Sequence, residues 1–138
     1  MVGETSPRIL VVDDDEELRG MICNFLTFRG CCVETACDGV EGCAAFERGT
    51  FDMVITDIYM PRMNGLEFLD TIKQKDVDLP IIAMTGFPNA DITEKVIEKG
   101  ACDCMVKPFS LKHLITTIKK CFEQSASHKA LSKTLSEN

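Results

Sequence analysis

The chain alternates short apolar runs with longer segments in which apolar residues recur at helical spacing, and it does so five times. Short runs rich in Val and Ile are typical of buried strands in a parallel sheet. The runs cover residues 9–12, about 32–36, 53–56, 81–84 and about 102–106. This alternation predicts an α/β domain with a parallel sheet, right-handed crossovers and helices on both faces. The first, third and fourth runs are the most continuously apolar, so we expect them at the centre of the sheet.

The helical segments show which side chains should face the sheet. In the second segment we expect Val40, Cys43 and Ala44 to point inward. The fifth has the clearest apolar stripe, formed by Leu111, Leu114, Ile115, Ile118, Cys121 and Phe122. Beyond Gln124 the sequence is polar and lacks a sustained stripe. We therefore expect one domain over residues 8–124, a flexible N-terminus over 1–7 and a polar tail or linker over 125–138.

Composition narrows the classes of protein. With 138 residues, 45% of them hydrophobic, the chain is suited to one domain with one core. A net charge of −7 disfavours direct nucleic-acid binding, which needs clustered Lys and Arg. No apolar run approaches the roughly 20 residues that span a bilayer, and the N-terminus lacks the apolar stretch of a signal peptide. We expect a cytoplasmic protein without membrane insertion.

Eight cysteines are many for this length. They are consistent with a redox switch or a metal cluster, but no CxxC spacing occurs. Several of them fall at apolar positions of helical or strand-like patterns, where cysteine serves as a small buried residue. We favour that interpretation, with reduced thiols in a reducing compartment.

Polar residues follow four of the apolar runs directly. Asp13 and Asp14 follow the first run, Asp57 the third, Thr85 the fourth and Lys107 the fifth. The carboxyl ends of parallel strands meet at one edge of the sheet, where open α/β sheets place their ligands. Several carboxylates held close together cannot all ionise comfortably without a cation. The pattern therefore predicts a divalent metal and an acidic group that uses it.

Each of these residues also has an ordinary explanation. Asp13 and Asp14 are suited to capping the helix that follows, although Asp15 and its acidic neighbours could serve instead. Asp57 could be a turn acid, Thr85 part of a turn, and Lys107 a solvated lysine. All four together, each after a separate strand, are much harder to explain in this way.

The same residues resemble a known family. Its motifs appear in order as Asp13-Asp14, Asp57 followed by Met60-Pro61-x-Met63-x-Gly65, Thr85-Gly86 and Lys107-Pro108-Phe109. Over about residues 8–124 the chain resembles the receiver domain of two-component response regulators. The resemblance implies a flavodoxin-like (βα)5 fold with strand order 2-1-3-4-5.

The function that the resemblance implies is that of a switch in two-component signal transduction or a phosphorelay. The phosphoryl donor would be a sensor histidine kinase or a histidine phosphotransfer protein, and an output domain or a homodimer would be possible partners. The domain would not be an enzyme beyond self-catalysed phosphoryl transfer and slow autodephosphorylation.

The resemblance also implies roles for individual residues. Asp57 would be the phosphoacceptor. Asp14 would bind Mg²⁺ directly and Asp13 mainly through water, and Asp57 and the backbone carbonyl of Tyr59 would complete the protein ligands. Mn²⁺ could substitute for Mg²⁺.

Three further roles follow from the resemblance. Lys107 would pair with Asp57 and then with the phosphate. Thr85 would donate its hydroxyl to a phosphate oxygen. The peptide bond before Pro108 would be cis.

The chain departs from the family pattern at Cys104, where many members carry an aromatic residue that moves on phosphorylation. We therefore expect the signal to leave through residues 86–88 and the fourth helix. Phe87 in this loop could form a binding surface or pack on the domain's own edge. Tyr59 and Phe87 should flank the approach of water to Asp57, which predicts a long-lived phosphoryl group.

Two other hypotheses remain open at this point. A small phosphatase of the haloacid-dehalogenase type would also form an aspartyl-phosphate, but it carries DxDxT, whereas Ile58-Tyr59 follow Asp57 here. A flavin- or dinucleotide-binding module would be expected to have GxGxxG after the first strand, and none is present.

Overall fold

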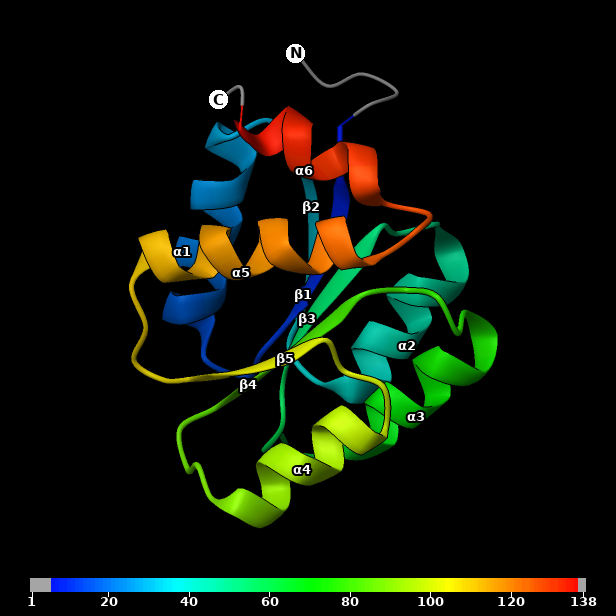
Figure 1. The fold of residues 1–138 in the computed structure, drawn as a ribbon. Helices are drawn as coiled ribbons and strands as arrows, with labels where there is room; N and C mark the ends of the chain where they lie inside the picture. Colours follow the sequence, from blue (N-terminus) through cyan, green and yellow to red (C-terminus); the bar gives the residue numbers. More distant parts are fainter. Residues whose placement is uncertain (1–5, 137–138) are drawn as a thin grey trace.

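The computed structural model describes residues 6–136 and contains one five-stranded parallel sheet (Figure 1). Its strands are β1 (Arg8–Val12), β2 (Cys32–Ala36), β3 (Met53–Asp57), β4 (Ile81–Thr85) and β5 (Asp103–Val106). They pair in the order β2-β1-β3-β4-β5. The flavodoxin-like fold and its strand order are thus confirmed. The three most apolar runs form the central strands β1, β3 and β4. Helices cover both faces of these strands, so their residues must be apolar on both sides.

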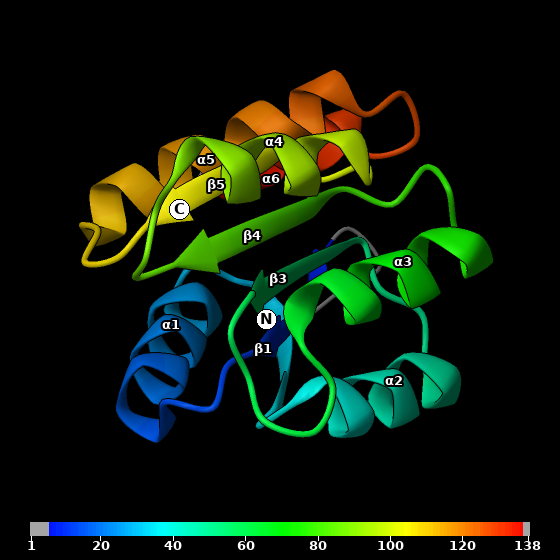
Figure 2. The ribbon, with the colours of Figure 1, turned by 90° about the horizontal axis from the view of Figure 1, so that it is seen from below.

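Within the described residues five helices connect or follow the strands, and a sixth lies C-terminal to them. They are α1 (Glu16–Phe28), α2 (Gly39–Arg48), α3 (Gly65–Lys75), α4 (Ala90–Glu98), α5 (Leu111–Gln124) and α6 (Lys129–Ser136). Each of the first five begins after an Asp, Asn or Ser whose side chain accepts a hydrogen bond from the first turn. Figure 2 shows α2 and α3 side by side, away from α1.

The core consists of two layers, one on each face of the sheet. Alternate residues of a strand point to opposite faces, so Ile9 and Val11 join the layer under α1 and α5. Leu10 and Val12 join the layer under α2, α3 and α4. The strands are therefore held from both sides, and the loops at their carboxyl ends start from a fixed frame.

The inward face of α2 differs from our prediction. Val40 is 45% exposed and Ala44 is also exposed, whereas Ala45 is buried. Gly42 lies so close to α3 that a β-carbon there would stand 2.9 Å from the Phe68 ring. The helix packs through its small residues, which turns Val40 outward.

The C-terminal segment corrects a second prediction. The sequence predicts a polar tail or linker over residues 125–138, but residues 129–136 form α6, which packs against α5 (Figure 1); residues 137–138 lie outside the described part of the chain. Leu135 is fully buried in the layer under α1 and α5, and Leu131 packs against it. Two leucines four residues apart are enough for one face of a two-turn helix, although the stripe is too short to detect in the sequence.

The cysteines also depart in part from expectation. Cys31 is buried, and burial raises the pKa of its thiol to about 11, as expected of an apolar filler. Cys102 and Cys121, however, form a disulfide that ties the start of β5 to α5. The expectation that all thiols are reduced is wrong for this pair. The two cysteines are 19 positions apart in the sequence, and only the fold brings them together.

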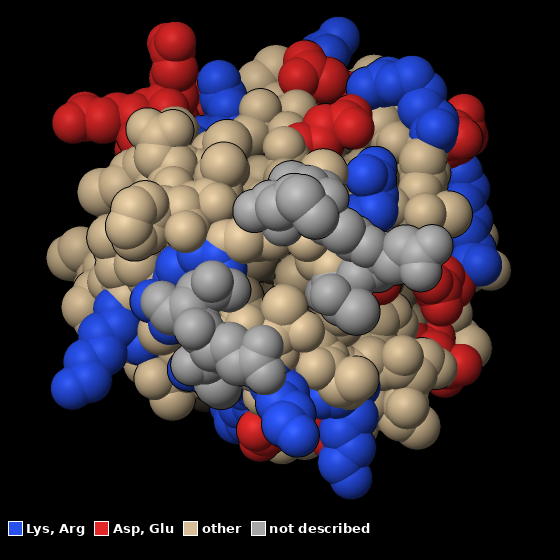
Figure 3. Space-filling view, turned by 90° about the horizontal axis from the view of Figure 1, so that it is seen from above, with Lys and Arg blue, Asp and Glu red and all other residues tan. Residues whose placement is uncertain are grey.

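The start of β1 and the end of α6 lie on the same side of the molecule, at the amino ends of the strands. Figure 3 looks onto this side, where Lys and Arg side chains are interspersed with Asp and Glu. Residues 1–5 of the expected N-terminal segment lie outside the described residues, and Pro7 accepts a hydrogen bond from the Cys32 backbone at 2.8 Å. Within residues 6–136 we find no helix of the length and apolarity that crossing a bilayer requires.

Candidate functional site

The predicted site residues meet at the carboxyl ends of the strands. Asp13 follows β1, Asp57 is the last residue of β3, and Thr85 is the last residue of β4. Lys107 comes directly after β5. We call this edge of the sheet the carboxyl-end rim.

Three carboxylates form a cluster on this rim. One oxygen from each of Asp13, Asp14 and Asp57 lies within 4.8 Å of the others. Asp13 is fully buried and Asp57 is 5% exposed, whereas Asp14 faces solvent. Asp15 caps α1 by accepting from the backbone N–H groups of Glu17 and Leu18, so capping requires neither Asp13 nor Asp14. Closely spaced carboxylate oxygens, two of them buried, are the donor set that hard divalent cations such as Mg²⁺ prefer.

Lys107 is the positive charge among these acids. Its Nζ lies 2.8 Å from Asp13 Oδ2 and 3.4 Å from Asp57 Oδ2. We expected a pair with Asp57, but Lys107 is closer to Asp13. Asp13 is the more deeply buried of the two acids and has the greater need of a counter-charge. Although burial opposes its charge, the pKa of Lys107 is raised because these two acids bind the ammonium.

The charge balance at the rim is incomplete. Burial, with the nearby charge of Asp13, raises the pKa of Asp57 to about 6, although Lys107 and the Ile58 N–H act in the opposite direction. That N–H donates to Asp57 Oδ1 over 2.9 Å. One lysine therefore does not fully compensate the clustered carboxylates, and a bound cation would.

A pocket of about 310 Å³ opens above Asp57. Tyr59 and Phe87 stand on opposite loops at this pocket, with ring centroids 5.8 Å apart in an edge-to-face contact. Phe87 still has 73% of its surface exposed. Phe87 thus packs against the domain with only part of its side chain. Its role in binding a partner stays a prediction. The buried Thr85 hydroxyl accepts a hydrogen bond from the Phe87 N–H at 3.0 Å.

The loop between β3 and α3 passes close to the phosphoacceptor candidate. The N–H of Gly65 donates to the Ile58 carbonyl over 2.7 Å, and a β-carbon at Gly65 would collide with the Asp57 carbonyl oxygen. Only glycine permits this close approach. The Lys107-Pro108 bond is cis, as the family resemblance implied.

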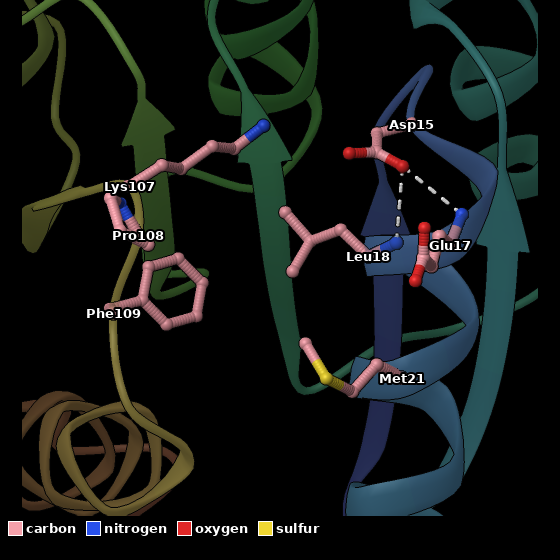
Figure 4. A pocket seen from close by; sticks show the side chains of 7 residues that line it. All are labelled: Asp15, Glu17, Leu18, Met21, Lys107, Pro108 and Phe109. Carbon is pink, nitrogen blue, oxygen red and sulfur yellow. Dashed lines mark hydrogen bonds between the residues drawn. The ribbon is translucent and has the colours of Figure 1, made fainter.

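An apolar groove of about 420 Å³ adjoins the rim (Figure 4). Leu18 and Met21 of α1 form one wall, and Pro108 and Phe109 face them across the groove. Lys107 lines the end nearest the aspartates, and Asp15 and Glu17 add acidic groups. A second, shallower hollow along α1 shares Met21 with this groove and is also lined by Phe28, whose side chain is 88% exposed.

Comparison with known proteins supplies the identity. Residues 9–119 match the family model described as the response regulator receiver domain. The chain belongs to the response regulator receiver family. In this receiver domain the aspartate cluster is consistent with a phosphoacceptor site, and the phosphatase hypothesis gains no support.

Individual relatives agree with this assignment. The receiver is 33% identical over 125 residues to the transcriptional regulatory protein PrrA of Mycobacterium tuberculosis, covering 91% of this chain but 54% of PrrA. It thus spans about half the length of that relative. It resembles the chemotaxis protein CheY4 of Vibrio cholerae, with a TM-score of 0.81, 31% identity, and coverage of 84% of this chain and 98% of CheY4.

A third relative was solved with ligands. It is a chain of the CheX-CheY-BeF3-Mg²⁺ complex of Borrelia burgdorferi, with a TM-score of 0.80 and 25% identity. The match covers 83% of this receiver and 88% of that chain.

The structure adds residues that sequence reasoning missed. An Arg19 guanidinium nitrogen donates to the Asp13 carbonyl oxygen over 2.7 Å and so ties α1 to the rim. Arg62 contacts Asp38, which caps α2. Asp38 before Gly39 at the start of a helical pattern was a readable capping signal. No pattern in the sequence pointed to Arg62 or Arg19.

Proposed function

We propose that this receiver accepts a phosphoryl group on Asp57 from a phosphorylated histidine. The observation that carries the proposal is the buried Asp57 carboxylate beside the 310 Å³ pocket, with the Lys107 ammonium 3.4 Å from Oδ2. In the transfer, a bond forms between an Asp57 oxygen and phosphorus as the bond from phosphorus to the histidine nitrogen breaks. The electron pair leaves with the imidazole, which then takes up a proton.

We further propose that Mg²⁺ is held by Asp13, Asp14, Asp57 and the carbonyl of Tyr59, with Mn²⁺ able to substitute. The support is the trio of carboxylates within 4.8 Å and the presence of Mg²⁺ in the Borrelia complex. When bound, the ion would neutralise charge on the transferring phosphoryl group. Lys107 is suited to pairing with a phosphate oxygen. Because Thr85 accepts from Phe87, its own hydroxyl proton is available to the phosphate.

The apolar groove beside α1 supports a protein as the phosphoryl donor. Leu18, Met21 and Phe109 offer an apolar surface next to Lys107, which is suited to a helix carrying the phosphohistidine. The donor would be a sensor histidine kinase or a histidine phosphotransfer protein in the cytoplasm. Since the receiver spans about half of PrrA, a relative named for transcriptional regulation, an output domain or a second receiver is the proposed recipient of the signal.

Acetyl phosphate tests the central proposal without the protein donor. Incubation with acetyl phosphate and Mg²⁺ should add one phosphoryl group, detected by intact mass, and Asp57→Asn should abolish it. Asp52→Asn, which changes a partly buried acid elsewhere, is the control. Undiminished phosphorylation of the Asp57→Asn protein, or none in the parent, would overturn the assignment.

Asp14→Ala tests the metal ligand separately. It should abolish Mg²⁺ binding and phosphorylation while leaving the fold intact, because Asp14 is exposed. Asp15→Asn is the matched control, since asparagine also caps a helix and the same charge is lost one residue away. Equal Mg²⁺ affinity in Asp14→Ala and the parent would show that the cluster is misassigned.

A further inference from the structure

The loop that joins β3 to α3 contains an unusual backbone conformation. Arg62 has φ of +68°, and among the described residues it is the only non-glycine residue with positive φ. A residue with a β-carbon is strained in this region. Contacts of the side chain must offset that strain for the conformation to persist.

Asp38 supplies these contacts. The Nε and Nη2 atoms of Arg62 both lie 2.7 Å from Asp38 Oδ2. The other oxygen, Oδ1, accepts from the Glu41 N–H at 2.8 Å and caps α2. The hydrogen bond from Glu41 and the charge of Arg62 hold the pKa of Asp38 below its usual range. The Asp38 side chain is 7% exposed, so the pair connects the loop to a fixed point rather than to a mobile surface group.

The next residue strengthens the connection between the loop and α2. A β-carbon at Gly39 would lie 2.8 Å from Met63, so α2 and the loop are already in close contact. Cys43 Sγ lies 3.8 Å from Met63 Sδ. With Gly65 bound to Ile58, the loop is fixed on both sides of Tyr59, which lines the Asp57 pocket.

We propose that Arg62 is a positioning residue for the metal site. Its ion pair with Asp38 holds in place the loop that carries Tyr59, whose carbonyl would be one of the Mg²⁺ ligands. The inference rests on the proposed Mg²⁺-dependent function of the rim. A ligand that is already in place loses less conformational freedom on binding, so breaking the pair weakens Mg²⁺ binding.

The direction of the effect separates this role from long-range electrostatics. Arg62→Ala removes a positive charge from the neighbourhood of an acidic cluster, and by Coulomb's law alone that change strengthens the binding of a cation. Loss of positioning should instead weaken the binding of the cation. We expect Arg62→Ala to bind Mg²⁺ about tenfold more weakly than the parent, a size typical of groups that orient metal ligands.

Tyr59 itself provides the readout, because the chain has one tyrosine and no tryptophan. Its fluorescence during a titration with Mg²⁺ alone gives the affinity without any phosphoryl transfer. Arg62→Gly removes the pair but relaxes the backbone, so it should be at least as stable as Arg62→Ala yet bind Mg²⁺ equally weakly. Arg62→Lys should recover part of the affinity. Arg48→Ala, which breaks the ion pair with Glu34 farther along α2, should leave it unchanged.

A double-mutant cycle completes the test. Asp38→Asn keeps a capping side chain but loses the charge, and in its presence Arg62→Ala should have little further effect. Unchanged Mg²⁺ affinity in a folded Arg62→Ala or Arg62→Gly protein, or effects that add fully in the double variant, would overturn the positioning role. A parent that neither binds Mg²⁺ nor accepts phosphate would instead refute the proposed function, and with it this inference.

Discussion

The two ends of the sheet are built on opposite principles. At the amino ends of the strands, α6 closes the core with the buried Leu135, a disulfide joins β5 to α5, and Asp52 accepts a hydrogen bond from the Arg8 N–H. At the carboxyl-end rim, Asp13 and Asp57 share one lysine. The first end is held by apolar packing, a covalent bond and paired polar groups, although Arg29 Nε is buried there without a hydrogen-bond partner. The second holds buried charge that the protein alone does not balance, which is the condition under which a cation and a phosphoryl group bind.

This contrast indicates which part of the domain can be changed without loss of phosphorylation. Stability should be concentrated at the amino ends of the strands, and binding at the rim should be obtained at the expense of stability. A substitution at the amino ends should therefore lower stability without affecting phosphorylation, whereas a substitution at the rim should affect binding and phosphorylation.

The largest expected effect on stability comes from the closed end. Leu135→Ala should lower the free energy of unfolding by about 2 to 5 kcal/mol, because it leaves a cavity in the core. Denaturant unfolding measures the loss. Phosphorylation by acetyl phosphate should stay at the parent level while the variant is folded. Ala130→Gly, at an exposed position of the same helix, is a control that weakens α6 without a cavity and should lose only about 1 kcal/mol.

A loss of phosphorylation in folded Leu135→Ala would show that the two ends are coupled. Stability and phosphorylation would then not be separate properties of the two ends of the sheet.

At the carboxyl-end rim, removing the charge of Asp57 should raise the free energy of unfolding rather than lower it. The folded protein holds the Asp57 proton more tightly than the unfolded chain, since its pKa is raised to about 6. Ionising Asp57 therefore leaves stability unchanged well below pH 4 and lowers it as pH rises through about 4 to 6. Without divalent cations, Asp57→Asn should raise the free energy of unfolding by about 1 to 3 kcal/mol at pH 7. The gain should disappear near pH 3.

Asp52→Asn is the control from the other end of the sheet. It weakens the acceptor of the Arg8 N–H, so it should lower stability at pH 7 rather than raise it. Mg²⁺ should narrow the gap between the parent and Asp57→Asn, because a ligand that binds only the folded state stabilises it. A stability gain for Asp57→Asn that is constant with pH would contradict the raised pKa of Asp57.

The smallest effect concerns the lifetime of the phosphoryl group. Tyr59 and Phe87 line the pocket in edge-to-face contact, and neither can orient a water molecule as a carboxylate or amide would. Tyr59→Asn and Phe87→Glu, singly and together, should each speed the decay of phosphorylated protein several-fold. Decay of the isolated phosphoprotein, followed by intact mass, measures this.

Val77→Glu is the matched control for Phe87→Glu. Val77 is 74% exposed in the loop before β4, at the amino ends of the strands, so its substitution should leave the decay unchanged. Equal decay rates for the parent and the Tyr59 and Phe87 variants would rule out shielding by these rings.

Much of the architecture could be predicted because it depends on local periodicity. Apolar runs such as Ile9–Val12 are buried on both faces, and their lengths and spacing leave few alternatives to a parallel sheet. The gathering of Asp13, Asp57, Thr85 and Lys107 on one edge then follows from the parallel direction of the strands.

Helix packing was less predictable. Ala44 and Ala45 are adjacent and equally small, and only the close approach of α2 to α3 at Gly42 decides that Ala45 faces inward. The same limit explains α6, whose two leucines carry no periodic signal until the surface under α1 and α5 is known.

The fold class and the set of residues that face one another at the rim could be predicted from the sequence, and the strand order followed from the family resemblance. These features depend on the order of the apolar runs and on the polar residues directly after each run. Three contacts are visible only in the folded molecule: Lys107 lies closer to Asp13 than to Asp57, Cys102 bonds to Cys121, and Arg62 pairs with Asp38. Each of these contacts joins residues far apart in the chain, and its geometry depends on packing between elements, which no local pattern encodes.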